Sequence, residues 1–238
     1  MLFLMLVNSF DTKYAKTAYK YELLDKNFID LFSKNKKFNR IFTSVVENQE
    51  LNNSSNILLR SDITGQVIDT ILSHDFKSKH YLYYMGDVFK KDIINSQIKQ
   101  CRQHGVEIIN NSKYESFKEV IKILDKILSL FLKKDFIFIF TDPIIKTQSD
   151  YLFKVKSSKN DINKFVNIFK KLSNSRYVLN LEKNFFSKDY HQDIFFYVYS
   201  TKTKKVLAQG GGYHYQKNQK VINGIGFSYD VDSLVELI

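Results

Sequence analysis

Segments that favour β-structure cluster towards the two ends of the chain, and several of them are joined by short polar turns. Residues 40–46 and 81–89 are rich in β-branched and aromatic side chains, and residues 193–199 and 221–227 repeat the pattern near the end. Strands joined by short turns pair antiparallel, whereas parallel neighbours need a long crossover connection. The chain is therefore predicted to be an α+β protein with a mainly antiparallel sheet and helices on one face.

The remaining elements follow from the spacing of apolar residues. Asp62 and Thr64 occupy the start of one predicted helix, whose buried face carries Val67, Ile68 and Ile71. Further helices are predicted over residues 13–33, 117–131, 162–169 and 231–238, further strands over 57–60, 105–109, 136–140, 178–181 and 205–209, and a loop over 52–56. The sequence contains no obvious linker, so residues 1–238 are predicted to form a single domain.

The composition argues against disulfide-bonded, nucleic-acid-binding and membrane proteins. The single cysteine, Cys101, excludes an intrachain disulfide and a cysteine-based metal site, and it favours a reducing, cytoplasmic setting. The formal net charge is +11, but the excess is almost entirely lysine spread along the chain. Arginine is the preferred bidentate reader of phosphates, so a nucleic-acid partner is not expected. The apolar segment over residues 1–7 is too short to cross a membrane, so no membrane association is expected.

Several familiar catalytic motifs are missing from the sequence. The histidines lack the spacing of metal ligands, and the sequence contains neither HExxH nor GxSxG. Gly210, Gly211 and Gly212 are not followed by Lys and Ser or Thr, so they do not form a P-loop. Three glycines after a strand instead predict a bulge or a close approach of the backbone. No metal and no cofactor are expected.

Four segments in a fixed order carry a more specific signal. They are residues 39–47, residues 59–90, residues 189–196, and the glycine-rich residues 210–227. Together with the sequence Gln-His-Gly-Val-Glu at residues 103–107, they resemble the signature motifs of histidyl-tRNA synthetase-like proteins. The resemblance is greatest to the shorter, non-synthetase branch, the regulatory subunit of ATP phosphoribosyltransferase. It implies a class II aminoacyl-tRNA synthetase-like core, a mainly antiparallel sheet flanked by helices, without an anticodon-binding domain.

The resemblance also implies a site for histidine. In the family, acidic and amide side chains hold the α-ammonium and imidazole groups of the amino acid, between aromatic walls. By position, the corresponding residues are Asp62, Thr64, Gln103, Glu107, Tyr190, His191 and Tyr213. His191 stands where the family has a tyrosine, which bears on the selectivity of the pocket.

Each of these residues also fits a purely structural role. Asp62 and Thr64 fit a helix cap equally well. Gln103 and Glu107 are four residues apart, so within a strand they share one side, which fits either a common pocket or a solvated edge. Tyrosines are more often found in the core or at the rim of a pocket than on a ligand.

The expected nucleotide site departs from the family pattern. The resemblance aligns Lys90, Phe186 and Ser233 with arginines that stabilise the phosphates of ATP in adenylating enzymes. Lysine keeps a charge but lacks the planar fork of arginine, and the other two residues keep neither. Losing one preorganised charge costs ~2.7–4 kcal/mol in a transition state. No catalytic residue is therefore expected.

The resemblance thus implies a non-catalytic regulatory subunit of ATP phosphoribosyltransferase that binds L-histidine for feedback control of histidine biosynthesis. Its expected partners are the short-form catalytic subunit and a second copy of the chain, in a homodimer. Two alternatives stay open. One is a divergent amino-acid-activating, adenylate-forming enzyme that relies on Lys90 alone, and the other is a tRNA- or protein-binding adaptor with an empty pocket.

Overall fold

The computed structural model describes residues 15–51, 54–75, 77–91, 97–141, 162–180, 191–217 and 219–238. The strands are β1 (Asn39–Arg40), β2 (Val46–Leu51), β3 (Ser54–Leu59), β4 (His80–Lys91), β5 (Ile98–Ile109), β6 (Phe136–Thr141), β7 (Arg176–Asn180), β8 (His191–Ser200), β9 (Val206–Lys217) and β10 (Lys220–Asp230). The helices are α2 (Ala15–Ser33), α3 (Ile63–His74), α4 (Lys113–Leu132) and α6 (Val231–Val235), and residues 162–172 form a further helix.

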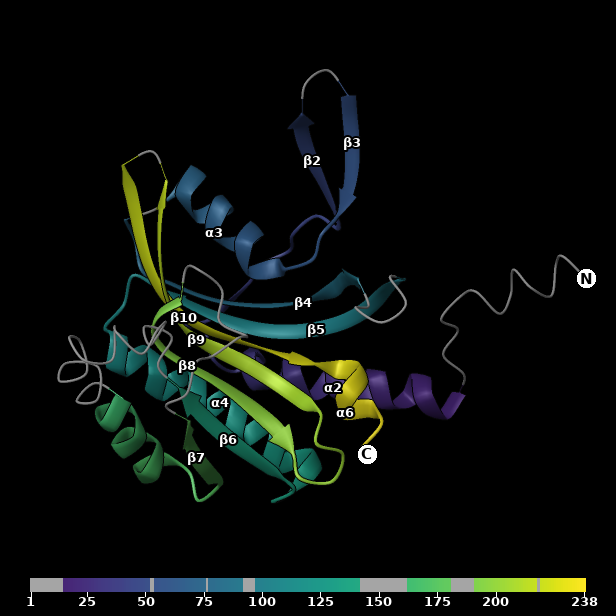
Figure 1. Cartoon of the computed structure of the whole chain (residues 1–238), viewed down its shortest axis with the longest axis vertical. Helices are drawn as coiled ribbons and strands as arrows, with labels where there is room; N and C mark the ends of the chain where they lie inside the picture. The colour runs from purple at the N-terminus through teal and green to yellow at the C-terminus, as the bar shows by residue number, and fades with distance from the viewer. Residues whose placement is uncertain are drawn as a thin grey trace, which may run out of the picture.

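Eight of these strands form one sheet in the order β1–β4–β5–β10–β9–β8–β6–β7, while β2 and β3 form a separate hairpin (Figure 1). The outermost pairs, β1 with β4 and β6 with β7, are parallel. The pairs between them are antiparallel. The mainly antiparallel sheet that the sequence predicts is therefore confirmed.

Helices cover both faces of the sheet, which corrects the prediction that they lie on one face. On one face, α2, α4, α6 and the helix of residues 162–172 pack in the larger core with Val106 and Ile108 of β5. On the other, α3 packs over Leu82 and Tyr84 of β4 (Figure 1). Successive residues of a strand point to opposite faces, so the odd-numbered residues of β5 face α3. Apolar periodicity predicts the α3 helix but does not say which face of the sheet it covers.

The predicted strand over residues 40–46 is wrong, because only its first residue belongs to β1 and its last opens β2. The side chain of Arg60 holds the chain where it leaves the sheet, and it is 3% exposed. Its guanidinium donates to the carbonyl oxygens of Thr43 at 3.0 Å and Ser44 at 3.2 Å, and its Nε donates to the Asp87 carbonyl at 2.6 Å. These tertiary contacts override the β-propensity of the segment. Strand β3 also begins inside the predicted loop over residues 52–56.

The glycine run of β9 lies where neighbouring strands approach closely. A Cβ atom at Gly210 would lie 2.4 Å from the carbonyl oxygen of Gly226, and one at Gly211 would lie 2.5 Å from that of Ile194. No side chain fits at either position. The close backbone approach that the sequence predicts for these glycines is confirmed.

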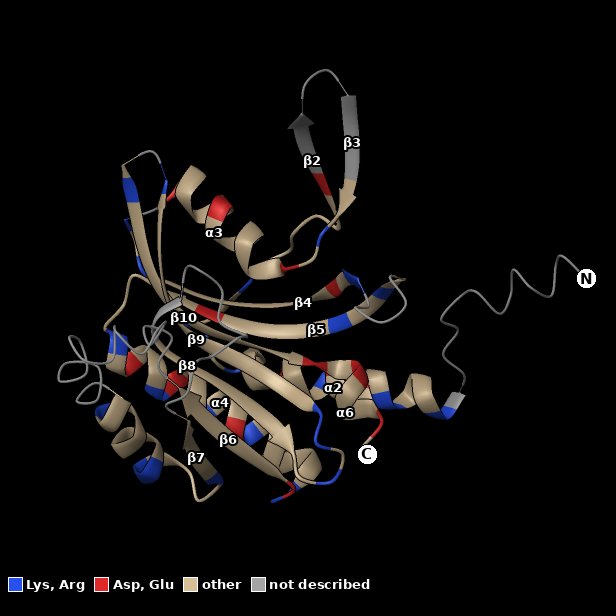
Figure 2. Cartoon of the chain, in the orientation of Figure 1, with Lys and Arg blue, Asp and Glu red and all other residues tan. Residues whose placement is uncertain are grey.

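Basic residues are distributed over many elements. Figure 2 shows them on α2, on the helix of residues 162–172 and near the tips of β9 and β10. Within the described segments, no helix is both long enough and apolar enough to span a membrane.

Candidate ligand site on the α3 face of the sheet

Glu107 lies in β5 on the face that α3 covers, and its side chain is 1% exposed. The Thr64 hydroxyl, in the first turn of α3, donates to Glu107 Oε1 at 2.8 Å. The Tyr213 hydroxyl, from β9, donates to Glu107 Oε2 at 3.1 Å. Burial raises the pKa of Glu107 to about 7, although both hydrogen bonds act to lower it. Near neutral pH this carboxyl is therefore present in both its protonated and its ionised form.

Two glycines of β10 make room for this cluster. A Cβ atom at Gly226 would lie 2.0 Å from Glu107 Oε2, and one at Gly224 would lie 2.3 Å from the ring of Tyr213. Gly226 pairs with Glu107 across the sheet, and Gly224 pairs with Tyr213. The carboxyl and the ring fit only because these two positions carry no side chain.

Asp62 directly precedes α3 and caps it. One of its carboxylate oxygens accepts the Thr64 N–H at 3.0 Å, which confirms the helix start that the sequence predicts. Asp62 also lines an open cavity of about 610 Å³ between the base of the β2–β3 hairpin and α3. The structure thus gives Asp62 a capping contact, and its role toward a ligand stays a prediction.

A second cavity, of about 220 Å³, opens on the same face of the sheet. Lys90 of β4 and Gln103 of β5 line it, together with Gln209 of β9 and with Ser228 and Asp230 of β10. Gln103 and Asp230 pair directly across the two strands. We call this the Lys90 cavity. Its wall offers one cation, one carboxylate, two amides and the hydroxyls of Ser228 and of Tyr197 in β8, a set that suits a small polar ligand with charges of both signs.

The structure brings some of the predicted ligand residues together and separates others. Thr64, Glu107 and Tyr213 are in contact, whereas Gln103 lines the Lys90 cavity. Gln103 and Glu107 do share one side of β5, as their spacing predicts. The backbone of His191, in β8, pairs with Tyr213, so this residue lies along the strand next to the cluster.

The residues of the expected nucleotide site are described only in part. Lys90 lines the cavity that bears its name. Ser233 lies in α6, and its backbone N–H donates to Asp230 Oδ1 at 2.8 Å, so that Asp230 caps the helix. Phe186 lies outside the described residues, and so does Tyr190 of the predicted histidine pocket.

Sequence reasoning missed Gln209, Ser228 and Asp230. The signal for the last two is their alternation with Phe227 and Tyr229, whose side chains are buried in the larger core. Polar residues at every second position of an otherwise apolar strand share one face of the sheet, and here that face borders a cavity.

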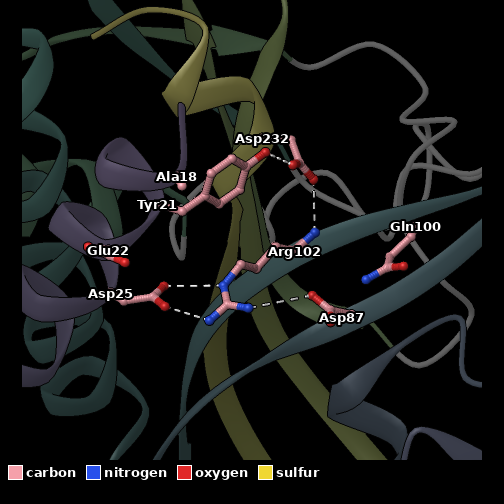
Figure 3. Close-up of a pocket in the computed structure, with 8 residues that line it drawn as sticks. All are labelled: Ala18, Tyr21, Glu22, Asp25, Asp87, Gln100, Arg102 and Asp232. Atoms are coloured by element: carbon pink, nitrogen blue, oxygen red, sulfur yellow. Dashed lines mark hydrogen bonds and ion pairs between the residues drawn. The ribbon is translucent and has the colours of Figure 1, made fainter. Parts of the chain in front are cut away.

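The opposite face of β5 carries a charged network around Arg102 (Figure 3). The guanidinium donates to both carboxylate oxygens of Asp25 on α2, and one of its nitrogens lies 3.9 Å from Asp87. The Arg102 backbone N–H donates to Asp232 of α6 at 2.9 Å, and the Tyr21 hydroxyl donates to the same carboxylate. These groups line a cavity of about 330 Å³.

His104 lies beneath this network and is 0% exposed. Its Nε2 atom is 2.8 Å from Asp25, and its Nδ1 atom contacts the hydroxyl of Tyr229. Burial lowers the pKa of His104, which favours the neutral form of the ring. Burial opposes ionisation of Asp25, but hydrogen bonds from His104 and Arg102 outweigh it and lower the pKa of this carboxyl. The network fastens α2 and α6 to β5.

The described residues do not favour a cysteine nucleophile or a metal site. Burial raises the pKa of the Cys101 thiol, which disfavours the nucleophilic thiolate. Among the described residues, no group of three or more histidine, cysteine, aspartate or glutamate side chains could hold a metal ion.

Comparisons with known proteins agree on one fold. The family model described as histidyl-tRNA synthetase matches residues 31–149, half of the chain. A chain of the ATP phosphoribosyl transferase (HisG:HisZ) complex from Thermotoga maritima is similar with a TM-score of 0.71 and 15% identity, over 89% of this chain and 97% of that chain. A search of curated protein sequences finds no match.

Two further structures extend the comparison. An ATP phosphoribosyltransferase regulatory subunit/histidyl-tRNA synthetase from Bacillus halodurans C has a TM-score of 0.76 and 15% identity, over 96% of this chain and 81% of that chain. The apo histidyl-tRNA synthetase of S. aureus has a TM-score of 0.71 and 16% identity, over 96% of this chain and 72% of that chain. Likeness at these identities shows the fold, a class II synthetase-like core.

Proposed function

Because the chain belongs to the histidyl-tRNA synthetase family, we propose that it is a non-catalytic member of that family, a regulatory subunit of ATP phosphoribosyltransferase in L-histidine biosynthesis. Its ligand is L-histidine, and its partner is a short-form catalytic subunit in the cytoplasm. In this proposal residues 1–238 act as one synthetase-like domain. Two observations together carry the proposal. The Glu107 carboxyl is buried and held by two hydroxyl groups, and none of the described residues that line the Lys90 cavity, where the resemblance expects the phosphates of ATP, is an arginine.

The chemistry of the Glu107 cluster supports histidine as the ligand. A carboxyl whose pKa is about 7 ionises readily when a cationic group approaches, and histidine offers both an α-ammonium and an imidazole. Thr64 and Tyr213 already orient the two carboxyl oxygens. Charge-assisted hydrogen bonds from the ligand would then replace or supplement those of the two hydroxyls.

The residues where the resemblance expects the phosphates of ATP support the proposal that the protein does not catalyse adenylation. Lys90 is exposed, and it stands where the resemblance expects the fork of an arginine. Asp230, a carboxylate, lines the same cavity and would repel the phosphates of ATP. Ser233 supplies no charge at all. Transition-state charge on a transferring phosphate would therefore lack the preorganised cations that stabilise it.

The comparisons support the choice of partner. The similar chain from Thermotoga maritima comes from a complex of ATP phosphoribosyl transferase, and 97% of its length is covered. The similar protein from Bacillus halodurans C is named as a regulatory subunit of that enzyme or a histidyl-tRNA synthetase. The fold alone accommodates both functions, so the side chains of the site favour the first.

Reconstitution with a short-form ATP phosphoribosyltransferase catalytic subunit tests the proposal. The two proteins are expected to elute together in gel filtration, and the complex is expected to differ in activity from the catalytic subunit alone. Failure to form a complex, or a complex with unchanged activity, would reject the regulatory role. Amino-acid-dependent ATP–pyrophosphate exchange tests the competing enzymatic function, and exchange above background would favour that function instead.

A further inference from the structure

The Lys90 cavity carries a carboxylate at a place where a nucleotide site would need positive charge. Asp230 lines the cavity from the end of β10, directly across from Gln103. Its Oδ1 atom accepts the N–H of Ser233 and thereby caps α6. Within the described part of the chain, Oδ2 of Asp230 makes no hydrogen bond or ion pair, so it is available to a ligand.

The positive charges near Asp230 belong to exposed lysines, so solvent screens their effect on the cavity. Lys90 is exposed, and so is Lys99, which pairs with it on β5. The side chain of Asp230 is half-buried. Solvent and salt screen exposed charges much more than buried ones, so the carboxylate determines the potential inside the cavity more than the lysines at its rim.

We propose that Asp230 is the selectivity residue of the Lys90 cavity, where it excludes nucleotide polyphosphates and binds the ammonium group of a zwitterionic ligand. Lys90 then meets the single carboxylate of that ligand, and the amides of Gln103 and Gln209 complete the polar contacts. This inference rests on the proposed function, because it places part of the proposed L-histidine ligand in the Lys90 cavity, which opens on the same face of the sheet as the Glu107 cluster. It extends that function because repulsion by the Asp230 carboxylate, in addition to the missing arginines, would then prevent nucleotide binding.

The chain offers a matched control two residues away. Asp232 belongs to the same helix end as Asp230, but it lines the cavity around Arg102 on the opposite face of the sheet. Asparagine is as good a helix cap as aspartate, so Asp230→Asn removes the charge and keeps the contact to Ser233. Asp232→Asn removes the same charge outside the Lys90 cavity.

Isothermal titration calorimetry of wild type and both variants with ATP in EDTA, and separately with L-histidine, tests the inference. Removing a like charge from the cavity is expected to raise ATP affinity at least about tenfold in Asp230→Asn. The same variant is expected to bind L-histidine about tenfold more weakly, because a charge-assisted hydrogen bond is lost. Asp232→Asn should resemble wild type in both titrations.

The inference requires both changes in Asp230→Asn. ATP binding that stays undetectable or unchanged there, or that rises equally in Asp232→Asn, would overturn it, and so would unchanged binding of L-histidine. Circular dichroism confirms folding, and Asp230→Ser, another good cap, replaces the asparagine variant if that protein does not fold. Both expected changes in a protein that forms no complex with the catalytic subunit would reject the regulatory role and leave the assignment of Asp230 standing.

Discussion

The carboxyl of Glu107 is buried, accepts hydrogen bonds from two hydroxyl groups and titrates near neutral pH. Its pKa rises from 4.5 to about 7 on folding, so the folded protein binds this proton more tightly than the unfolded chain does. The stability that this proton contributes is fully present below about pH 4.5 and is lost as the pH rises through about 7. The difference corresponds to roughly 3 kcal/mol.

Glu107→Gln should remove this dependence, because glutamine has nearly the same shape and does not ionise. We expect the variant to gain stability over wild type as the pH rises from 5 to 8, by up to roughly 3 kcal/mol in urea denaturation. Asp30→Asn serves as the control, since Asp30 is exposed on α2. If the pH profiles of wild type and Glu107→Gln run parallel, this carboxyl does not titrate as described.

The same substitution addresses ligand binding. Glu107→Gln is expected to weaken the binding of L-histidine by ~1.5–3 kcal/mol in calorimetry, the range for a hydrogen bond to a charged group. Equal affinity of wild type and variant would remove Glu107 from the ligand site.

The roles of some single residues can be predicted from the sequence, and those of others cannot. Asp62 as a helix cap follows from local rules, because its partner is two residues away. The contact between Thr64 and Glu107 joins residues that are distant in the chain, and the resemblance implied only that both belong to one site. Alternation with Phe227 and Tyr229 indicates the face of the sheet on which Asp230 lies, but its position in the cavity depends on the pairing of β10 with β5 and β9, which is not visible in the sequence.

At the scale of elements, β5 connects the two faces of the sheet. Gln103 and Glu107 face the ligand site, while Arg102 and His104 point to α2 and α6. The sequence predicts only the apolar end of this strand, residues 105–109, because residues 99–104 are mostly polar and lack the apolar pattern of a strand. Of those polar residues, Arg102 and His104 contact α2 and α6, whose residues lie far away in the sequence.

Arg102→Lys tests how firmly this network holds α2. Lysine cannot donate to both oxygens of Asp25 in the planar geometry of arginine. The Arg102 side chain is 34% exposed, so solvent screening limits the expected loss of unfolding free energy to about 1 kcal/mol. Lys118→Ala, which removes an exposed ion pair with Glu115 on α4, should cost less than about 0.5 kcal/mol. Equal losses in the two variants would show that the network does not anchor the helix.

At the scale of the whole molecule, the prediction that two copies associate awaits a test. We propose that the surface used includes α2 and the segment that follows it. Phe42 precedes the β2–β3 hairpin and is 75% exposed, and Val45 and Leu59 at the base of this hairpin are 41% and 44% exposed. Neighbouring exposed apolar side chains favour contact with another protein surface. A two-fold symmetric contact is the commonest way to cover such a surface in a homo-oligomer.

Light scattering at micromolar concentration should therefore give the mass of a dimer, and Phe42→Glu should shift the mass towards that of a monomer. Leu130→Glu introduces the same charge at a residue of α4 that is 55% exposed, and it should leave the dimer intact. A monomeric wild type, or a dimer that Phe42→Glu does not weaken, would exclude this surface.

The overall fold was the most predictable level, since the α+β class and the mainly antiparallel sheet follow from strand patterns and turn residues. The placement of α3 on its own face of the sheet and the departure of the β2–β3 hairpin were not predictable. Both depend on buried contacts, such as those of Arg60 with the carbonyl oxygens of residues 43 and 44, which form only in the folded molecule.

Feedback inhibition by L-histidine is the most direct test of the regulatory role. The measurement is the activity of a short-form ATP phosphoribosyltransferase, reconstituted with wild type or with Glu107→Gln, across a titration of L-histidine. We predict that wild type confers inhibition and that Glu107→Gln forms the same complex but requires at least about tenfold more histidine, as expected for a lost charged hydrogen bond. Identical inhibition curves for both complexes, or a catalytic subunit equally sensitive to histidine without this protein, would contradict the account.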